Sequence, residues 1–74
     1  MTLDGLEVGS QGRVADISGD DEISIRLMEM GLIPGTEFRI VGFAPLGDPI
    51  EIELRGYRLS LRRSEGGRVE VQQF

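Results

Sequence analysis

Cysteine, histidine and lysine are all missing from the 74 residues of this chain. Without cysteine there is neither a disulfide nor a thiolate metal site, and the absence is consistent with a reducing cytoplasm. Without these three residue types no usual nucleophile–base pair or Schiff base can be assembled, so we expect no catalytic residues and no enzyme. Imidazole and thiolate are the usual ligands of iron and zinc, so we expect no metal site and no cofactor.

Long apolar runs are also missing, since the longest uninterrupted ones are two or three residues. A membrane-spanning helix needs about 20 mostly apolar residues, so we expect no membrane insertion. The start, Met1 to Asp4, carries neither basic residues nor an apolar stretch and does not resemble a signal peptide. These features predict a cytoplasmic protein made of one domain, residues 1–74.

Positive charge is scarce and unevenly placed, because the net charge is −5. Residues 1–54 hold eleven acids against three arginines, whereas residues 55–68 hold five arginines against one acid. These arginines either pair with Glu51 and Glu53 across a hairpin or face an acidic partner surface or RNA. Only Tyr57 lies near them to stack on a base, so a nucleic-acid partner is not expected.

Short alternating apolar runs between eleven glycines predict a small, mainly β fold. One helix, over about Asp21–Met30, interrupts this pattern, because Ile23, Leu27 and Met30 fall on one helical stripe. Asp20 or Asp21 is placed to cap its start, and Gly31 supplies the left-handed residue that ends it. Glu22 and Arg26 have the spacing of a favourable pair on the helix surface. The next turn, residues 33–36, has the proline and glycine of a type II turn.

Five short strands are predicted, at residues 12–17, 37–43, 50–55, 58–62 and 68–72. In so small a chain they would bury most surface as a closed barrel, which also protects strand edges. We therefore predict a monomeric SH3-like five-stranded barrel with one inserted α-helix. Residues 37–43 carry large apolar side chains on both faces, which places this strand between the barrel interior and the helix.

The hairpin register follows from matching apolar residues on one face. If Gly56-Tyr57 forms a two-residue type II′ turn, Leu54 pairs with Leu59. Arg55 then faces Arg58 at the turn.

Two segments contain apolar residues for which the core pattern has no place. The loop between the second and third strands presents Leu46 between prolines, and a stiff loop of this kind is a good contact point. The end of the helix adds Leu32 and Met28, and Met28 either contacts a partner or covers a seam of the barrel. We expect the loop and the helix end to form one partner-binding surface, steered by hairpin arginines. Its residues are Met28, Leu32, Pro45, Leu46, Gly47, Asp48, Pro49, Arg55, Tyr57 and Arg58.

Three stretches in this order resemble the FeoA family: RLMEMGLIPGTEFRIV, APLGDPIEIELRGYRLSLRRSE and RVEV. The resemblance runs from about Leu6 to Val71. It implies an SH3-like barrel, a cytoplasmic location and a link to FeoB, a membrane protein of ferrous-iron uptake with a cytoplasmic GTPase domain. One departure is Gly66, where the family often has alanine in a short helical turn, which glycine should weaken.

The resemblance implies an accessory protein that binds the cytoplasmic part of FeoB. A similar domain ends the iron-dependent repressors of the diphtheria-toxin-repressor type. The alternative is therefore a free-standing, metal-linked regulatory module. A DNA-binding segment or a histidine-containing site would favour that alternative, and the sequence contains neither.

Overall fold

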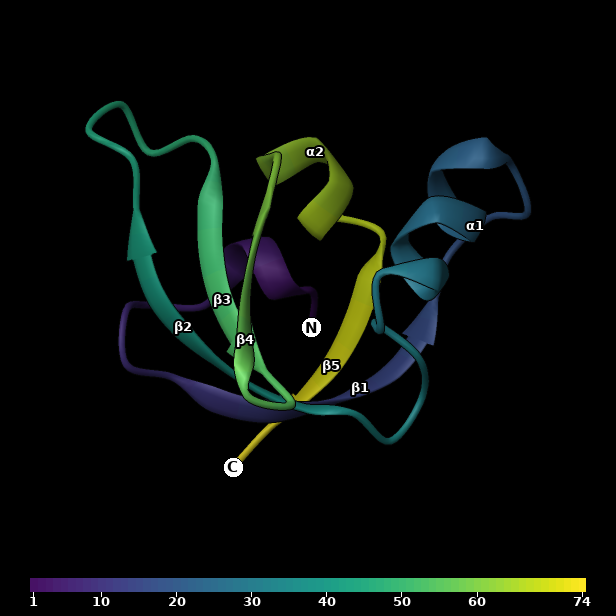
Figure 1. Ribbon diagram of the computed structural model, residues 1–74, viewed down its shortest axis with the longest axis horizontal. Coiled ribbons are helices and arrows are strands. Elements are labelled where there is room, and N and C mark those ends of the chain that lie inside the picture. Colours follow the sequence, from purple (N-terminus) through teal and green to yellow (C-terminus); the bar gives the residue numbers. More distant parts are fainter.

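A five-stranded antiparallel sheet forms the body of the protein, which a computed structural model describes over residues 1–74. The sheet curls around the core, with the short helices at its rim (Figure 1). The strands lie in the order β4-β3-β2-β1-β5. Their bounds are Gln11–Ile17 for β1, Glu37–Phe43 for β2, Ile50–Leu54 for β3, Tyr57–Leu61 for β4 and Val69–Gln73 for β5. The prediction of a mainly β fold with five short strands and one inserted helix is confirmed.

The two outer strands do not pair with each other, so hydrogen bonds do not close the barrel as predicted. The amino-terminal residues cover the edge of β5 instead. The backbone N–H of Val71 donates to the carbonyl oxygen of Met1 at 2.9 Å, and Thr2 forms a β-bridge with Glu70. Helix α2 connects these two outer strands at one end of the barrel (Figure 1).

Helix α1 (Glu22–Glu29) lies where the apolar stripe predicts it, between β1 and β2. The side chain of Asp21 caps it by accepting a hydrogen bond from the backbone N–H of Ser24 at 3.2 Å. Gly31 ends it with φ of 108°, a conformation that a side chain would strain. Leu27 is fully buried, so the predicted inner face is confirmed.

The core contains fourteen buried hydrophobic residues drawn from every strand, the helix and the amino terminus. Val14 and Ile17 from β1 and Val69 and Val71 from β5 are among them. The short 3-10 helix η1 (Leu3–Gly5) was not predicted, because three residues are too few to show a period. It buries Leu3 completely.

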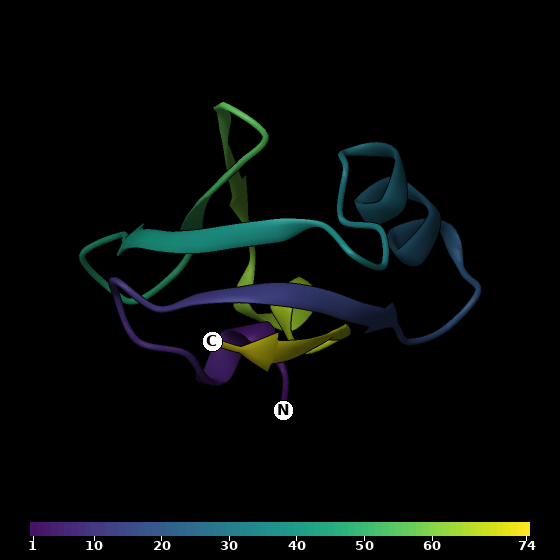
Figure 2. The same ribbon diagram turned by 90° about the horizontal axis from the view of Figure 1, so that it is seen from below.

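A bulge in β2 changes the predicted role of this strand. The register shifts between Ile40 and Gly42, so that Phe43 pairs with Ile50, a core residue. Phe43 therefore packs against the same core as Phe38. The prediction that β2 is sandwiched between the barrel and the helix was wrong, since the bulge returns Phe43 to the inner face. In Figure 2, α1 lies beyond the end of β1 and the start of β2.

The β3–β4 hairpin is shifted by two residues from the predicted register. Leu54 pairs with Tyr57, and the turn consists of Arg55 and Gly56, with φ of 49° and 83°. Positive φ at both positions is typical of a type I′ turn, whose twist fits a hairpin better than the predicted type II′ assignment. Because the shift is even, the apolar face is unchanged, but Arg58 faces Glu53 rather than Arg55.

The helical turn after the hairpin forms as α2 (Arg63–Gly66) despite its glycines. Gly66 is buried against η1, where an added Cβ would lie 3.4 Å from the Cβ of Asp4. Close packing therefore offsets the low helix propensity of glycine at this position.

Candidate interaction surface

The loop between β2 and β3 presents an apolar side chain at its tip. Leu46 is 97% exposed, the largest exposure of any large hydrophobic residue here. The loop is closed at its base by a hydrogen bond from the N–H of Ala44 to the carbonyl of Pro49 at 3.0 Å. A second bond, from the N–H of Gly47 to the carbonyl of Ala44 at 2.7 Å, tightens the turn at its tip. The predicted exposure of Leu46 is confirmed.

Arg63 holds the loop against the rest of the protein. Its Nε donates to the carbonyl of Gly47 at 2.6 Å, and its backbone N–H donates to Asp48 Oδ1 at 3.1 Å. Its guanidinium also donates to the carbonyl of Asp4 at 3.1 Å and lies 5.0 Å from the ring centre of Phe43. Asp48 thus connects the loop to α2. The loop is thus fixed on two sides, which lowers the entropy cost of presenting Leu46.

At the helix end, the structure separates the two predicted contact residues. Met28 is 38% exposed, whereas Leu32 is fully buried. The prediction of Leu32 as a contact residue was wrong: its N–H bonds back to the carbonyl of Leu27 at 3.1 Å, and Gly31 turns the chain so that Leu32 enters the core.

The hairpin tip is attached to this helix end. The hydroxyl of Tyr57 donates to the carbonyl of Met30, one of the carbonyls that a helix end leaves unpaired. Arg55 donates to Thr36 Oγ1 at 3.3 Å. Arg58 has no ion pair. Glu53, which lies opposite it in the hairpin, is paired instead with the guanidinium of Arg39 at 3.2 Å.

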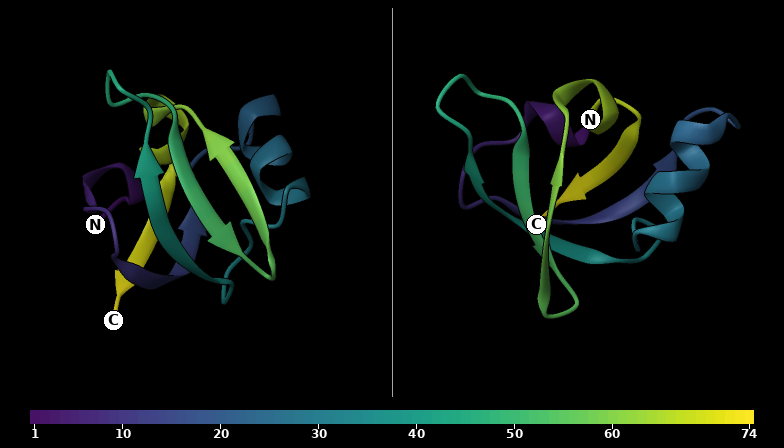
Figure 3. Two further views of the ribbon diagram at one scale, coloured as in Figure 1. Left: turned by 60° about the vertical axis from the view of Figure 1, so that its left-hand side comes forward. Right: turned by 45° about the horizontal axis from the view of Figure 1, so that its top comes forward.

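The predicted residues therefore fall into two groups rather than one surface. Pro45–Pro49 lie with Arg63 at one end of the molecule, whereas Met28, Arg55 and Tyr57 lie around the helix end. The β2–β3 loop and α1 are at opposite ends of the structure in every view (Figures 1, 2 and 3). A single small contact area cannot include both.

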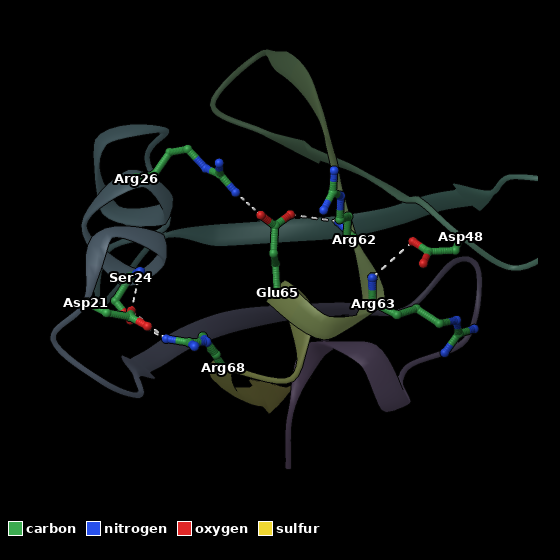
Figure 4. A network of polar contacts seen from close by, with 8 residues as sticks. All are labelled: Asp21, Ser24, Arg26, Asp48, Arg62, Arg63, Glu65 and Arg68. Carbon is green, nitrogen blue, oxygen red and sulfur yellow. Dashed lines mark hydrogen bonds and ion pairs between the residues drawn. The ribbon is translucent and has the colours of Figure 1, made fainter.

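A polar network joins α1, α2 and the end of β4 (Figure 4). Glu65 is only 8% exposed, and it accepts a hydrogen bond from the backbone N–H of Arg62 at 2.9 Å. Its other oxygen pairs with Arg26. Arg26 therefore pairs with Glu65 on α2 and not with Glu22 as predicted. An unpaired charge costs more free energy when it is buried, as the Glu65 carboxylate is. A groove of about 500 Å³ lies here, with Arg26, Arg62 and Glu65 in its lining.

Asp21 anchors the start of α1 to Arg68, the residue just before β5. The hydrogen bond from Arg68 lowers the pKa of Asp21 below its usual 3.8, and the backbone N–H of Ser24 lowers this pKa further. Both donors favour the ionised carboxylate.

Nowhere in the structure do three or more Asp and Glu side chains gather so that they could hold a metal ion. Asp21 caps the start of α1. Neither helix is long and apolar enough to cross a membrane.

The fold defines the protein as a small SH3-like barrel, and comparisons then identify its family. The chain belongs to the FeoA family, because the model of the FeoA domain matches residues 1–73. A curated relative from Porphyromonas gingivalis is an Fe(2+) transport protein A/Fe(2+) transporter FeoB fusion protein, 33% identical over 72 residues. The match covers 97% of this chain and 8% of the fusion protein, so the chain spans a small part of that relative's length.

Solved structures agree with this assignment. A FeoA-like protein from Clostridium acetobutylicum is 42% identical with a TM-score of 0.91, over 97% of this chain and 84% of that one. FeoA from Stenotrophomonas maltophilia, an SH3 domain protein complexed with zinc, is 34% identical with a TM-score of 0.85, over 97% and 89%. A manganese-dependent transcriptional repressor matches with a TM-score of 0.91, over 100% of this chain and 36% of the repressor chain. Because the two are only 18% identical, this match shows a shared fold and nothing more.

Proposed function

We propose that this protein is a cytoplasmic accessory factor of ferrous-iron uptake that binds the cytoplasmic part of a FeoB transporter. The observation that carries the proposal is the fusion relative, in which a segment 33% identical to this chain is covalently joined to FeoB. A linker keeps two domains at an effective concentration that favours contact, and fusion is of most use when the two parts act together. We expect the surface of this domain to make that contact.

The contact is centred on the Pro45–Pro49 loop. Single exposed apolar side chains are common on protein surfaces, so the exposure of Leu46 alone is weak support for a contact. The stronger support is that Arg63 holds this loop by Gly47 and Asp48, so Leu46 is presented in a fixed position. A rigid apolar anchor that enters a partner's pocket is the usual centre of binding energy.

The helix end and the hairpin tip form a separate surface, and they take a secondary part in this proposal. Met28 and Tyr57 are partly exposed there, but the hydroxyl of Tyr57 already bonds to the carbonyl of Met30. Arg55 and Arg58 add positive charge, which changes the association rate more than the lifetime of a complex.

A metal-linked regulatory module is the alternative. The manganese-dependent repressor has the same barrel fold at 18% identity. A similarity of fold alone does not support a shared function. Acids do not gather in this chain into a group that could hold a metal. The alternative therefore has less support than the transport role.

Isothermal titration of the purified protein into the purified cytoplasmic region of the FeoB from the same organism tests the proposal. We expect saturable binding with a stoichiometry of one. Addition of zinc or ferrous iron should leave the affinity unchanged. Binding only in the presence of metal would instead support the regulatory alternative. No binding, with or without nucleotide, would contradict the proposal.

A further inference from the structure

The outer edge of β4 carries unpaired backbone groups. β4 pairs with β3 alone, whereas the opposite edge of the sheet, at β5, is covered by Met1 and Thr2. We propose that the β4 edge is a docking site for an extended, acidic peptide segment, which adds to the sheet as a sixth strand. This site differs from the Leu46 loop and does not depend on the role proposed for it.

The hairpin register fixes which groups are free. Next to a two-residue turn, the closing pair of Leu54 and Tyr57 exchanges hydrogen bonds, and bonded pairs then alternate along the ladder. Arg58 and Ser60 therefore direct their N–H and C=O groups away from β3. Neither Arg58 nor Ser60 takes part in any hydrogen bond outside the strand ladder. The two N–H donors and two C=O acceptors of Arg58 and Ser60 therefore point outward, spaced so that another β-strand could pair with them.

The side chains along this edge favour an acidic partner. Arg58 and Arg62 lie four residues apart on β4 and just beyond its end, and neither has an ion pair. Glu53, which faces Arg58 across the hairpin, is already paired with Arg39. Arg26 adds a third guanidinium beside the groove at the end of the strand. A carboxylate opposite Arg58 and another opposite Arg62 would each meet an unpaired cation.

A second copy of this chain fits the same edge poorly. In an antiparallel pair of β4 strands in which Ser60 faces itself, Arg58 of each copy faces Arg62 of the other. Like charges directly opposite destabilise a sheet. Charged residues on an edge strand protect a protein against aggregation. Here the arginines would repel the β4 edge of a second copy, but they would attract an acidic strand.

The register also predicts the pattern of the incoming segment. Its residues opposite Leu59 and Leu61 would face the apolar side of the sheet, where Leu59 is only partly buried. Its residues opposite Arg58 and Arg62 would be acidic, and the one opposite Ser60 small or polar. The expected pattern is acid, apolar, polar, apolar, acid.

A capped Glu-Val-Ser-Val-Glu peptide tests this inference, because it has the same side-chain pattern in both directions. At a concentration about ten times the measured Kd, amide exchange at Arg58 and Ser60 should slow roughly tenfold, since only free protein exposes them. The amide of Leu59 already bonds within the hairpin and is the internal control. A Lys-Val-Ser-Val-Lys peptide should not bind.

Two variants separate backbone pairing from charge attraction. Ser60→Pro removes the outward N–H without breaking the β3–β4 ladder and should abolish the protection, whereas Ser60→Ala should retain it. Arg58→Glu should weaken binding about tenfold. Equal binding of the lysine peptide, or binding that Ser60→Pro leaves intact, would overturn the proposal. So would protection that rises with protein concentration without peptide, which would identify a second copy as the occupant.

Discussion

At the scale of single residues, Glu65 joins three elements through one buried carboxylate. It accepts from the backbone of Arg62 and pairs with Arg26 on α1. The removal of a buried acceptor leaves its donors without a partner, although Arg26 is 59% exposed and can turn to water. We expect Glu65→Ala to lower the free energy of unfolding by about 1–3 kcal/mol, measured by denaturant unfolding.

The matched control is Glu53→Ala. Glu53 also pairs with an arginine, but both side chains of that pair are at least 40% exposed. Its loss should change stability by less than about 0.5 kcal/mol. Equal effects of the two substitutions would show that Glu65 is not the buried junction of α1 and α2.

Asp21 gives a prediction for the dependence of stability on pH. Its folded pKa is lower than the unfolded value near 3.8, because Arg68 and Ser24 donate to the carboxylate. The stabilisation is therefore present above 3.8 and is lost as the pH falls through the folded pKa. Asp21→Asn should be less stable than the wild type at neutral pH. The difference should fade in acid, and a difference that stays constant to pH 2 would contradict this origin.

The identity of most core residues could be predicted at this scale, but their polar partners could not. Alternation predicts that Val14 and Val71 are buried because a strand has a fixed period. Leu32 was assigned to the surface because it follows the helix, where no period applies. Arg26 was assigned to Glu22 because only local pairs are visible in a sequence, and Glu65 lies 39 residues away.

At the scale of elements, the β3–β4 hairpin shows how a turn decides a register. The apolar pattern allows both the predicted register and the observed one, since an even shift keeps every side chain on its face. The observed turn places Arg55 at φ of 49°, an unfavourable angle for a residue with a side chain. Turn geometry and the partnership of Tyr57 with Met30 therefore selected the register, and neither is visible in the apolar pattern.

Substitutions in this turn test the observed register. Arg55→Asn should stabilise the protein by about 0.5–1 kcal/mol, because Asn-Gly is the preferred type I′ sequence. Gly56→Ala should destabilise it by about 1 kcal/mol, since the site has open space but φ of 83°. Thermal unfolding would measure both. A loss of stability in Arg55→Asn would indicate that position 55 is in the strand, as in the register predicted from sequence.

At the scale of the whole molecule, the order and type of the main elements could be predicted because each has its own period and its own turn residues. The barrel's open edge and the separation of the loop from the helix end could not. Both depend on how strongly the sheet curls, which is a property of packing in three dimensions rather than of any segment. The candidate surface was therefore right for Leu46 as an exposed residue and wrong in joining it to Leu32.

Metal affinity is also a property of the whole chain. Histidine and cysteine are missing, and no three acids gather in the fold. Anaerobic calorimetry with ferrous iron and with zinc should therefore show no stoichiometric site tighter than about micromolar. A tighter site would contradict this expectation and would direct attention to the zinc complex of the Stenotrophomonas maltophilia relative.

The affinity of Leu46→Asp for the cytoplasmic region of FeoB tests the central claim most directly. Its control is Ile25→Asp, which introduces the same charge at a half-exposed position on α1, at the other end of the molecule. Because Leu46 is the proposed anchor, its substitution should weaken binding at least about tenfold while the unfolding midpoint stays unchanged. Ile25→Asp should bind as the wild type does. Unchanged affinity of Leu46→Asp together with weakened Ile25→Asp would contradict the claim and move the interface to the helix end.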